Sequence, residues 1–216
     1  MTRRPEAMKI RSKLKSRAGF SLAETLLATL ILLLVSLIVA NGIPTARTVY
    51  NNVIIGANAQ TLLSTAVSSL RNELGAAQRV QVDASGNIFY YKPATGAYAV
   101  ISPSKATMTG ISPETIDPPD TDARMDGIQQ LDYVTQVTGG WKAIPDGETT
   151  KRQSHYLVSV AAANKNLKVT YGSADYNASQ PDIIAINNIT VSRAVGETTV
   201  IASLDKLVIR LSPISD

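Results

Sequence analysis

A single carboxylate stands in the longest apolar run of the chain. Residues 20–43 read FSLAETLLATLILLLVSLIVANGI, and Glu24 is their only charged residue. As a helix, Phe20–Ala40 would span about 30 Å, close to the thickness of a bilayer's hydrocarbon core. A carboxylate near mid-bilayer costs on the order of 3 kcal/mol, and less near a helix end. Glu24 therefore needs either a partner of opposite charge or a place in the first turn, where it reaches the headgroups and favours the helix N-terminus.

The charges before this run are almost all positive. Residues 1–19 hold seven basic residues against Glu6, a net charge of +6, whereas the rest of the chain holds 14 basic and 16 acidic residues, a net charge of −2. Only Arg47 follows the run closely. This bias predicts a single-pass membrane protein with a cytoplasmic N-terminus and an extracytoplasmic C-terminal part. Beyond residue 19 no basic stripe suggests a nucleic-acid partner.

The junction Arg17-Ala18-Gly19-Phe20-Ser21-Leu22-Ala23-Glu24 resembles the class III leader of type IV pilins and pseudopilins. The resemblance consists of a short basic leader, Gly19 before the cleavage site, the aromatic Phe20 after it, and Glu24 as the fifth residue of the mature chain. With the helix that follows, it covers roughly residues 9–74.

The resemblance implies that a membrane-embedded prepilin peptidase cuts between Gly19 and Phe20, and that the new amine of Phe20 is methylated. It also implies assembly with other pilin subunits on an inner-membrane platform, with Glu24 meeting the N-terminal amine of a neighbour. Glycine fits such a protease because an extended peptide without a side chain can enter a narrow site. Cleavage would also remove the +6 leader that holds the helix in the membrane.

A second helical segment is expected after the apolar run. Gly42 and Pro44 predict a kink or local unwinding, because proline lacks the amide donor of the helical hydrogen bond. The alternative is a membrane helix that ends at Asn41. Residues 44–74 are amphipathic, and Gly75 is a suitable helix stop. The positions expected on one face are Val49, Val53, Leu63, Val67, Leu70 and Leu74.

Residues 75–216 have the composition of strands and turns. Short runs rich in Val, Ile, Tyr and Thr alternate with Gly, Pro, Asn and Asp. Expected strands are 79–82, 87–91, 97–101, 156–161, 167–171, 191–195, 198–202 and 206–211, with residues 102–150 as a long excursion. The chain is thus predicted to be an α+β protein with four parts: a leader (1–19), a membrane or filament-core helix (20–43), its amphipathic continuation (44–74) and a β-rich head (75–216) packed on the helix, as in the pilin fold.

Side chains that could bind metal or catalyse a reaction are sparse. The chain has no cysteine, one histidine (His155) and no phosphate-binding or hydrolase motif, so we expect no enzyme. Asp120, Asp122 and Asp126 in a Pro-rich loop are weak calcium candidates, because their spacing departs from the EF-hand loop; no other cofactor is expected. We interpret His155 as an ordinary strand residue and Trp141 as a core residue.

These observations predict a major pilin, minor pilin or pseudopilin of a pilus-like or secretion filament. Two alternatives remain open. Ile38-Val39-Ala40 resembles a signal-peptidase site before Asn41, which would release a soluble secreted protein. Otherwise the helix serves only as a membrane anchor for a β domain that binds a ligand or substrate.

Overall fold

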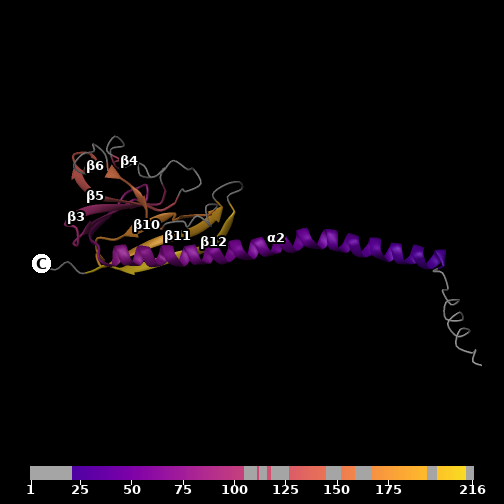
Figure 1. Cartoon of the computed structure of the whole chain (residues 1–216). Coiled ribbons are helices and arrows are strands. Elements are labelled where there is room, and N and C mark those ends of the chain that lie inside the picture. The colour runs from indigo at the N-terminus through magenta and orange to yellow at the C-terminus, as the bar shows by residue number, and fades with distance from the viewer. Residues whose placement is uncertain are drawn as a thin grey trace, which may run out of the picture. The chain divides into compact units, whose positions relative to one another are not determined.

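The computed structural model describes residues 21–104, 111, 116–117, 127–144, 152–158, 167–193 and 199–212. The chain divides into two compact units, residues 1–52 and residues 53–216. One helix, α2 (Leu22–Gly75), contains residues of both units, and the strands all belong to the second unit (Figure 1).

Helix α2 continues without interruption through Gly42 and Pro44. The expected local unwinding and the alternative of a helix that ends at Asn41 are therefore wrong, whereas a bend at this place stays a prediction. Hydroxyl groups add hydrogen bonds around the proline: Thr45 Oγ1 donates to the Asn41 carbonyl (3.1 Å) and Thr48 Oγ1 to the Pro44 carbonyl (3.0 Å). Such local donors help a helix to accommodate proline. The predicted end at Gly75 is confirmed.

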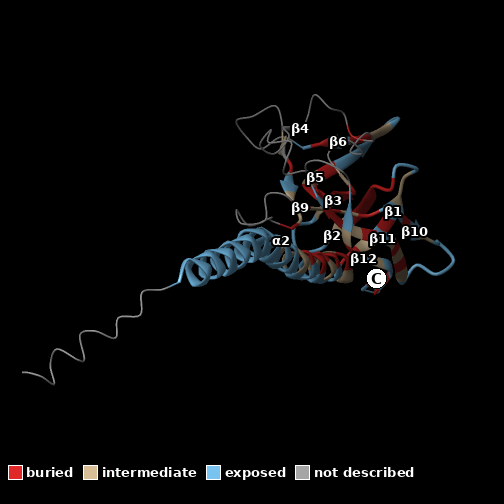
Figure 2. Cartoon of the chain, turned by 90° about the vertical axis from the view of Figure 1, so that its right-hand side faces the viewer, coloured by how far each residue is buried: buried red, intermediate tan, exposed pale blue. Residues whose placement is uncertain are grey.

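Burial changes sharply along α2, as Figure 2 shows by the passage from pale blue to red. Every residue from 21 to 54 is exposed, and the first fully buried helix residue is Ala59. The buried positions repeat every three or four residues, which is the spacing of one helix face: Ala59, Leu62, Leu63, Ala66, Leu70 and Leu74. Val49 and Val53, which we expected on this face, are 58% and 65% exposed.

The larger sheet has six strands in the order β1-β2-β3-β5-β6, with β8 pairing with β5, and all its pairings are antiparallel. Its strands are β1 (Gln78–Val82), β2 (Ile88–Lys92), β3 (Ala97–Ser102), β5 (Gln129–Val137), β6 (Gly140–Ala143) and β8 (His155–Tyr156). The first three were predicted within two residues at each end. β5 and β6 were not: they lie in the segment expected to be an excursion.

The second sheet is built around one long hairpin. β11 (Ile183–Arg193) pairs with β12 (Val200–Arg210) on one side and with β10 (Ser173–Tyr176) and β9 (Leu167–Thr170) on the other, all antiparallel. The expected short strands 191–195, 198–202 and 206–211 are thus the parts of two longer strands. A short parallel pair, β4 (Ile116–Asp117) with β7 (Arg152–Gln153), completes the described strands.

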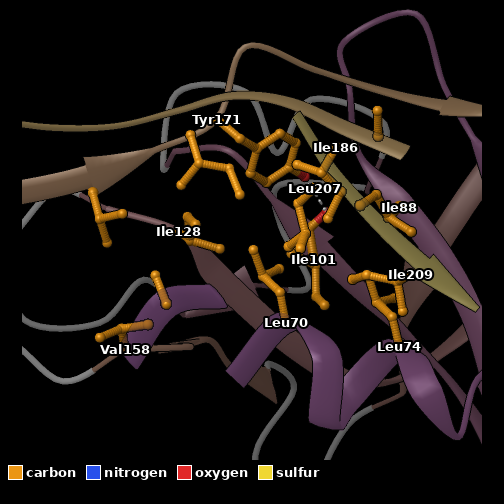
Figure 3. Packing of buried hydrophobic residues seen from close by; sticks show 14 of the residues in the cluster. Leu70, Leu74, Ile88, Ile101, Ile128, Val158, Tyr171, Ile186, Leu207 and Ile209 are labelled. Carbon is orange, nitrogen blue, oxygen red and sulfur yellow. Dashed lines mark hydrogen bonds between the residues drawn. The ribbon is translucent and has the colours of Figure 1, made fainter. Parts of the chain in front are cut away.

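The main hydrophobic core lies where α2 meets the two sheets. Figure 3 shows Leu70 and Leu74 of the helix beside Ile101, Leu207 and Ile209 of the strands. All five side chains are at most 4% exposed. Their burial, at about 25 cal/mol per Å² of apolar surface, is the main force that holds helix and sheets together. The predicted α+β class, a long N-terminal helix packed on antiparallel sheets, is confirmed.

A second, smaller core involves Trp141. Its ring stacks on Phe89 with 4.5 Å between centroids and lies 5.3 Å from the ring of Tyr98. Trp141 is 8% exposed and packs with a small group of buried residues, Val100, Ile111, Leu131, Val134 and Ala143. Stacked aromatic pairs contribute about 0.5–1.5 kcal/mol beyond their buried area. The interpretation of Trp141 as a core residue is confirmed.

Candidate functional site at the start of the helix

Ser21 and Glu24 form a reciprocal capping box at the first turn of α2. The Ser21 amide donates to Glu24 Oε2 at 2.9 Å, and the Glu24 amide donates to Ser21 Oγ at 3.3 Å. The Glu24 side chain thereby gives the Ser21 amide a partner, and the Ser21 hydroxyl adds a second acceptor for the Glu24 amide, which also donates to the Ser21 carbonyl at 2.9 Å. The carboxylate also lies at the positive end of the helix dipole, where a negative charge stabilises the helix.

The capping box uses only part of the Glu24 carboxylate. Oε2 accepts the Ser21 amide, whereas Oε1 has no hydrogen-bond partner among the described residues, and none of their cations lies within ion-pair distance. The first-turn interaction that the sequence left as an alternative is therefore present. One carboxylate oxygen remains to accept a hydrogen bond from another molecule.

Around Glu24 the helix surface is apolar. Leu22, Leu26 and Leu27 are 79%, 61% and 58% exposed. The hydroxyl groups in this part bond to their own helix: Thr25 to the Leu22 carbonyl (2.9 Å), Thr29 to Leu26 (2.9 Å) and Ser36 to Leu32 (2.8 Å). Satisfied hydroxyls and exposed leucines are what a helix in hydrocarbon needs. By length and composition α2 can cross a membrane near the N-terminus.

Several predicted site residues cannot be placed. Gly19 and Phe20 of the expected cleavage site lie outside the described residues, as do the calcium candidates Asp120, Asp122 and Asp126. Across the part of the chain that the structure describes, no group of three or more His, Asp or Glu side chains could hold a metal ion. His155 lies in β8 with an exposed side chain, which confirms its interpretation as a strand residue.

A partly buried polar cluster joins the C-terminal end of α2 to the larger sheet. Lys92 Nζ lies 3.1 Å from Glu73 and 3.8 Å from Asp132, so one cation pairs with carboxylates from the helix and from β5. Tyr90 Oη donates to Glu73 Oε2 and accepts from Gln130 Nε2, both at 3.2 Å. Burial of the ring, followed by the nearby charges of Glu73 and Asp132, raises the pKa of Tyr90 well above its usual value. These contacts link the C-terminal end of α2 to β2 and β5.

Sequence reasoning missed both features, for different reasons. Ser21 and Glu24 carry the Ser-x-x-Glu pattern of a capping box before an apolar run, and this local signal was available. The Tyr90 cluster has no local signal, because Glu73 and Asp132 are 59 positions apart in the chain and belong to different elements. Only the fold brings them together.

No protein-family model matches the chain, and neither a curated protein nor a solved structure matches it.

Proposed function

We propose that this protein is a structural subunit of a type IV pilus-like or type II secretion-like filament. It would be made as a precursor, cut between Gly19 and Phe20 by a prepilin peptidase, and assembled through the first part of α2. The observation that carries the proposal is the combination of basic residues 1–19, the Gly19-Phe20 junction and the exposed apolar first part of α2, in which Glu24 of the first turn is the only carboxylate among residues 21–54.

The physical argument concerns charge. Before cleavage the +6 leader holds the helix end at the cytoplasmic face, because basic residues are retained on that side. Cleavage removes this anchor and creates a positive amine on Phe20. Glu24 Oε1, which has no hydrogen-bond partner among the residues that the structure describes, can then accept a hydrogen bond from the amine of a neighbouring subunit while Oε2 keeps the helix capped. A shifted neighbour would leave opposite charges buried and unpaired, so this contact would set the axial register.

The exposed surface of α2 supports assembly as well as membrane storage. Large exposed apolar side chains run from Leu22 to Ile54, a stretch of about 50 Å along a helix. This exceeds the hydrocarbon thickness of about 30 Å. Residues such as Val49 and Tyr50 would therefore be covered by other helices, as packing in a filament core provides.

A second function is supported by the same helix. If α2 is only an anchor, the β domain would be a membrane-bound module that binds a ligand or substrate. A secreted product cut after Ala40 would lose the whole apolar segment, including the Ser21–Glu24 capping box.

The mass of the mature N-terminus separates these proposals. Protein purified from membranes or filaments should begin at Phe20 and carry one methyl group on its amine. Gly19→Leu should accumulate uncut precursor, because a bulky side chain blocks an extended substrate. Gly42→Leu is the matched control, since an added Cβ at Gly42 meets no atom within 4 Å, and it should be cut normally. A chain that begins at Asn41 or retains Met1 would contradict the pilin proposal.

A further inference from the structure

We propose that Asn177 is an acceptor for an N-linked oligosaccharide. Asn177-Ala178-Ser179 fits the acceptor pattern Asn-x-Ser, in which x is any residue except proline. The proposal rests on the proposed function in one respect: the β-rich domain must lie outside the cytoplasm, where transferases that use lipid-linked sugars act. The pattern alone occurs by chance, so the argument depends on the structure around it.

The connection between β10 and β11 presents the pattern to solvent. Asn177, Ala178, Ser179 and Gln180 are all exposed in a turn, and the Gln180 amide donates to the Asn177 carbonyl at 2.8 Å. An exposed turn is the kind of backbone that can enter the active site of a modifying enzyme after the protein has folded. Attachment of a bulky polar group here displaces no packed side chain.

The asparagine side chain is held in a suitable geometry. Asn177 Oδ1 accepts the backbone amide of Ser179 at 2.9 Å, which is an Asx turn. Nδ2, the atom that would be glycosylated, has no partner among the described residues, and neither does the Ser179 hydroxyl. The two side chains that the acceptor pattern requires are therefore both on the exposed turn and both available to an enzyme.

The reaction is a group transfer with a defined co-reactant, a polyprenyl-pyrophosphate-linked oligosaccharide. Asn177 Nδ2 attacks the anomeric carbon of the first sugar and loses one proton to the enzyme. The bond between that carbon and the pyrophosphate oxygen breaks, and the lipid pyrophosphate leaves. No oxidant or reductant takes part.

The residue two positions before the asparagine is also informative. Asp175 occupies that position with an exposed side chain, so a negative charge lies beside the acceptor turn. Its Oδ2 accepts Asn187 Nδ2 at 2.7 Å, which fixes the carboxylate at the end of β10. Asp175, Asn177 and Lys206 line one hollow of about 540 Å³ beside the turn, where the first sugars would lie.

A second Asn-x-Thr pattern in the chain provides an internal comparison. Asn188-Ile189-Thr190 lies within β11, where Ile189 is fully buried and Thr190 Oγ1 lies 3.3 Å from Thr170 Oγ1. This segment is paired with strands on both sides, and Ile186, two positions before Asn188, is not acidic. A transferase acting on the folded protein should therefore modify Asn177 and not Asn188.

The glycosylation of Asn177 can be tested by mass spectrometry of the full chain, purified from the envelope of the cells that produce it. Trypsin yields the peptide Val169–Arg193, which contains both patterns, and electron-transfer fragmentation locates the modification. We expect a glycan mass on Asn177 and none on Asn188. Ser179→Ala and Asn177→Gln should abolish it, whereas Ser179→Thr should retain it. Loss of the glycan in Asp175→Ala would show that the enzyme also recognises the acidic side chain, and retention would show that Asn-x-Ser is sufficient.

The same sample keeps this inference separate from the proposed function. An unmodified Asn177 on chains that begin at Phe20, or a glycan on Asn188 instead, overturns the inference and leaves the pilin proposal intact. A glycan on Asn177 of chains that retain Met1 supports the glycosylation inference and contradicts the pilin proposal.

Discussion

Glu24 has a role inside its own chain and a proposed role between chains. Within the chain, its Oε2 accepts the Ser21 amide and caps the helix. Between chains, its negative charge would meet the amine of a neighbouring subunit. The two roles need different chemistry, because glutamine can replace glutamate in a capping box but cannot form an ion pair.

Variants at this position can separate capping from charge. We expect Glu24→Ala and Glu24→Gln both to be cut after Gly19 and both to enter filaments poorly, because both lack the charge that pairs with the amine. The measurement is the ratio of filament-bound to membrane-bound subunit in sheared cells.

Thr25→Val provides the neighbouring control. Among the described residues, its hydroxyl bonds to the Leu22 carbonyl alone, so this variant should assemble normally. Assembly of Glu24→Gln at the wild-type level, with Glu24→Ala defective, would show that the glutamate serves as a helix cap and would refute the register argument.

Helix α2 does two different things along its length. Its first part exposes leucines such as Leu30, which is 55% exposed, while its last turns bury leucines such as Leu70, which is fully buried. The same residue type thus contributes to surface in one part and to core stability in the other. This difference predicts how substitutions along one helix affect the β-rich unit.

Leu70→Ala should destabilise the β-rich unit by about 2–5 kcal/mol, because it leaves a cavity in the main core. Leu30→Ala, the same change on an exposed part of α2, should leave that stability unchanged. Urea unfolding of the full chain in detergent, followed by the fluorescence of the single Trp141, measures both. Equal destabilisation by the two variants would contradict the observed division of the helix.

Strand irregularities explain part of what sequence patterns could not locate. Tyr133, with φ of 60°, is an extra residue in β5 between the pairs Tyr98↔Val134 and Ala99↔Asp132. Such a bulge interrupts the alternation of inward and outward side chains. In addition, Gln129 and Gln130 are buried in the same strand, within the segment 102–150 that was expected to be an excursion because it is rich in Pro, Asp, Thr and Gly. Gln130 Nε2 donates to Tyr90 Oη of β2 and to Asp132 Oδ1 two residues along its own strand, and these bonds offset the cost of burying the Gln130 amide.

At the scale of the whole molecule, two tyrosines tie distant elements together through buried hydroxyls. Tyr90 joins helix, β2 and β5, and Tyr171 donates to the carbonyls of Gly86 (2.8 Å) and Ile101 (3.1 Å). Burial raises the pKa of Tyr171, as it does that of Tyr90, and nearby Asp83 adds to the shift. Both side chains therefore stay protonated in the folded protein at pH values that ionise an unfolded tyrosine.

This difference predicts alkaline instability. Because the pKa of each tyrosine is higher in the folded than in the unfolded protein, each stabilises the fold fully below about pH 10, the pKa of an unfolded tyrosine. This stabilisation is lost progressively as the pH rises above that value. Each tyrosine should lower the unfolding free energy by about 1.4 kcal/mol per pH unit in that range. Tyr90→Phe should therefore roughly halve the part that Tyr90 and Tyr171 contribute to the slope of the unfolding free energy against pH. The variant also loses the hydrogen bonds of the hydroxyl, so it should be less stable than the wild type at neutral pH.

Urea midpoints measured from about pH 9 to pH 11 would test this. Tyr50→Phe, at a ring that is 66% exposed, is the matched control and should leave the slope unchanged. An unchanged slope in Tyr90→Phe would show that its hydroxyl ionises without unfolding.

The sequence by itself determined the features that depend on neighbours along the chain. The apolar run, the positive charge of residues 1–19, the helix end at Gly75 and the first three strands all rest on local composition and spacing. The capping box of Ser21 and Glu24 and the Asn177 pattern are local in the same sense, although neither of them was predicted from the sequence. Local backbone chemistry is sufficient for such features because their partners are a few residues away.

Only the tertiary structure decided which strands pair and which polar residues are buried. The merging of short apolar runs into β11 and β12, the addition of β5 to the sheet, and the cluster around Tyr90 depend on contacts between residues far apart in sequence. Local pattern cannot specify these, because the free energy that favours burying Gln130 or extending a strand comes from the partner that the fold supplies.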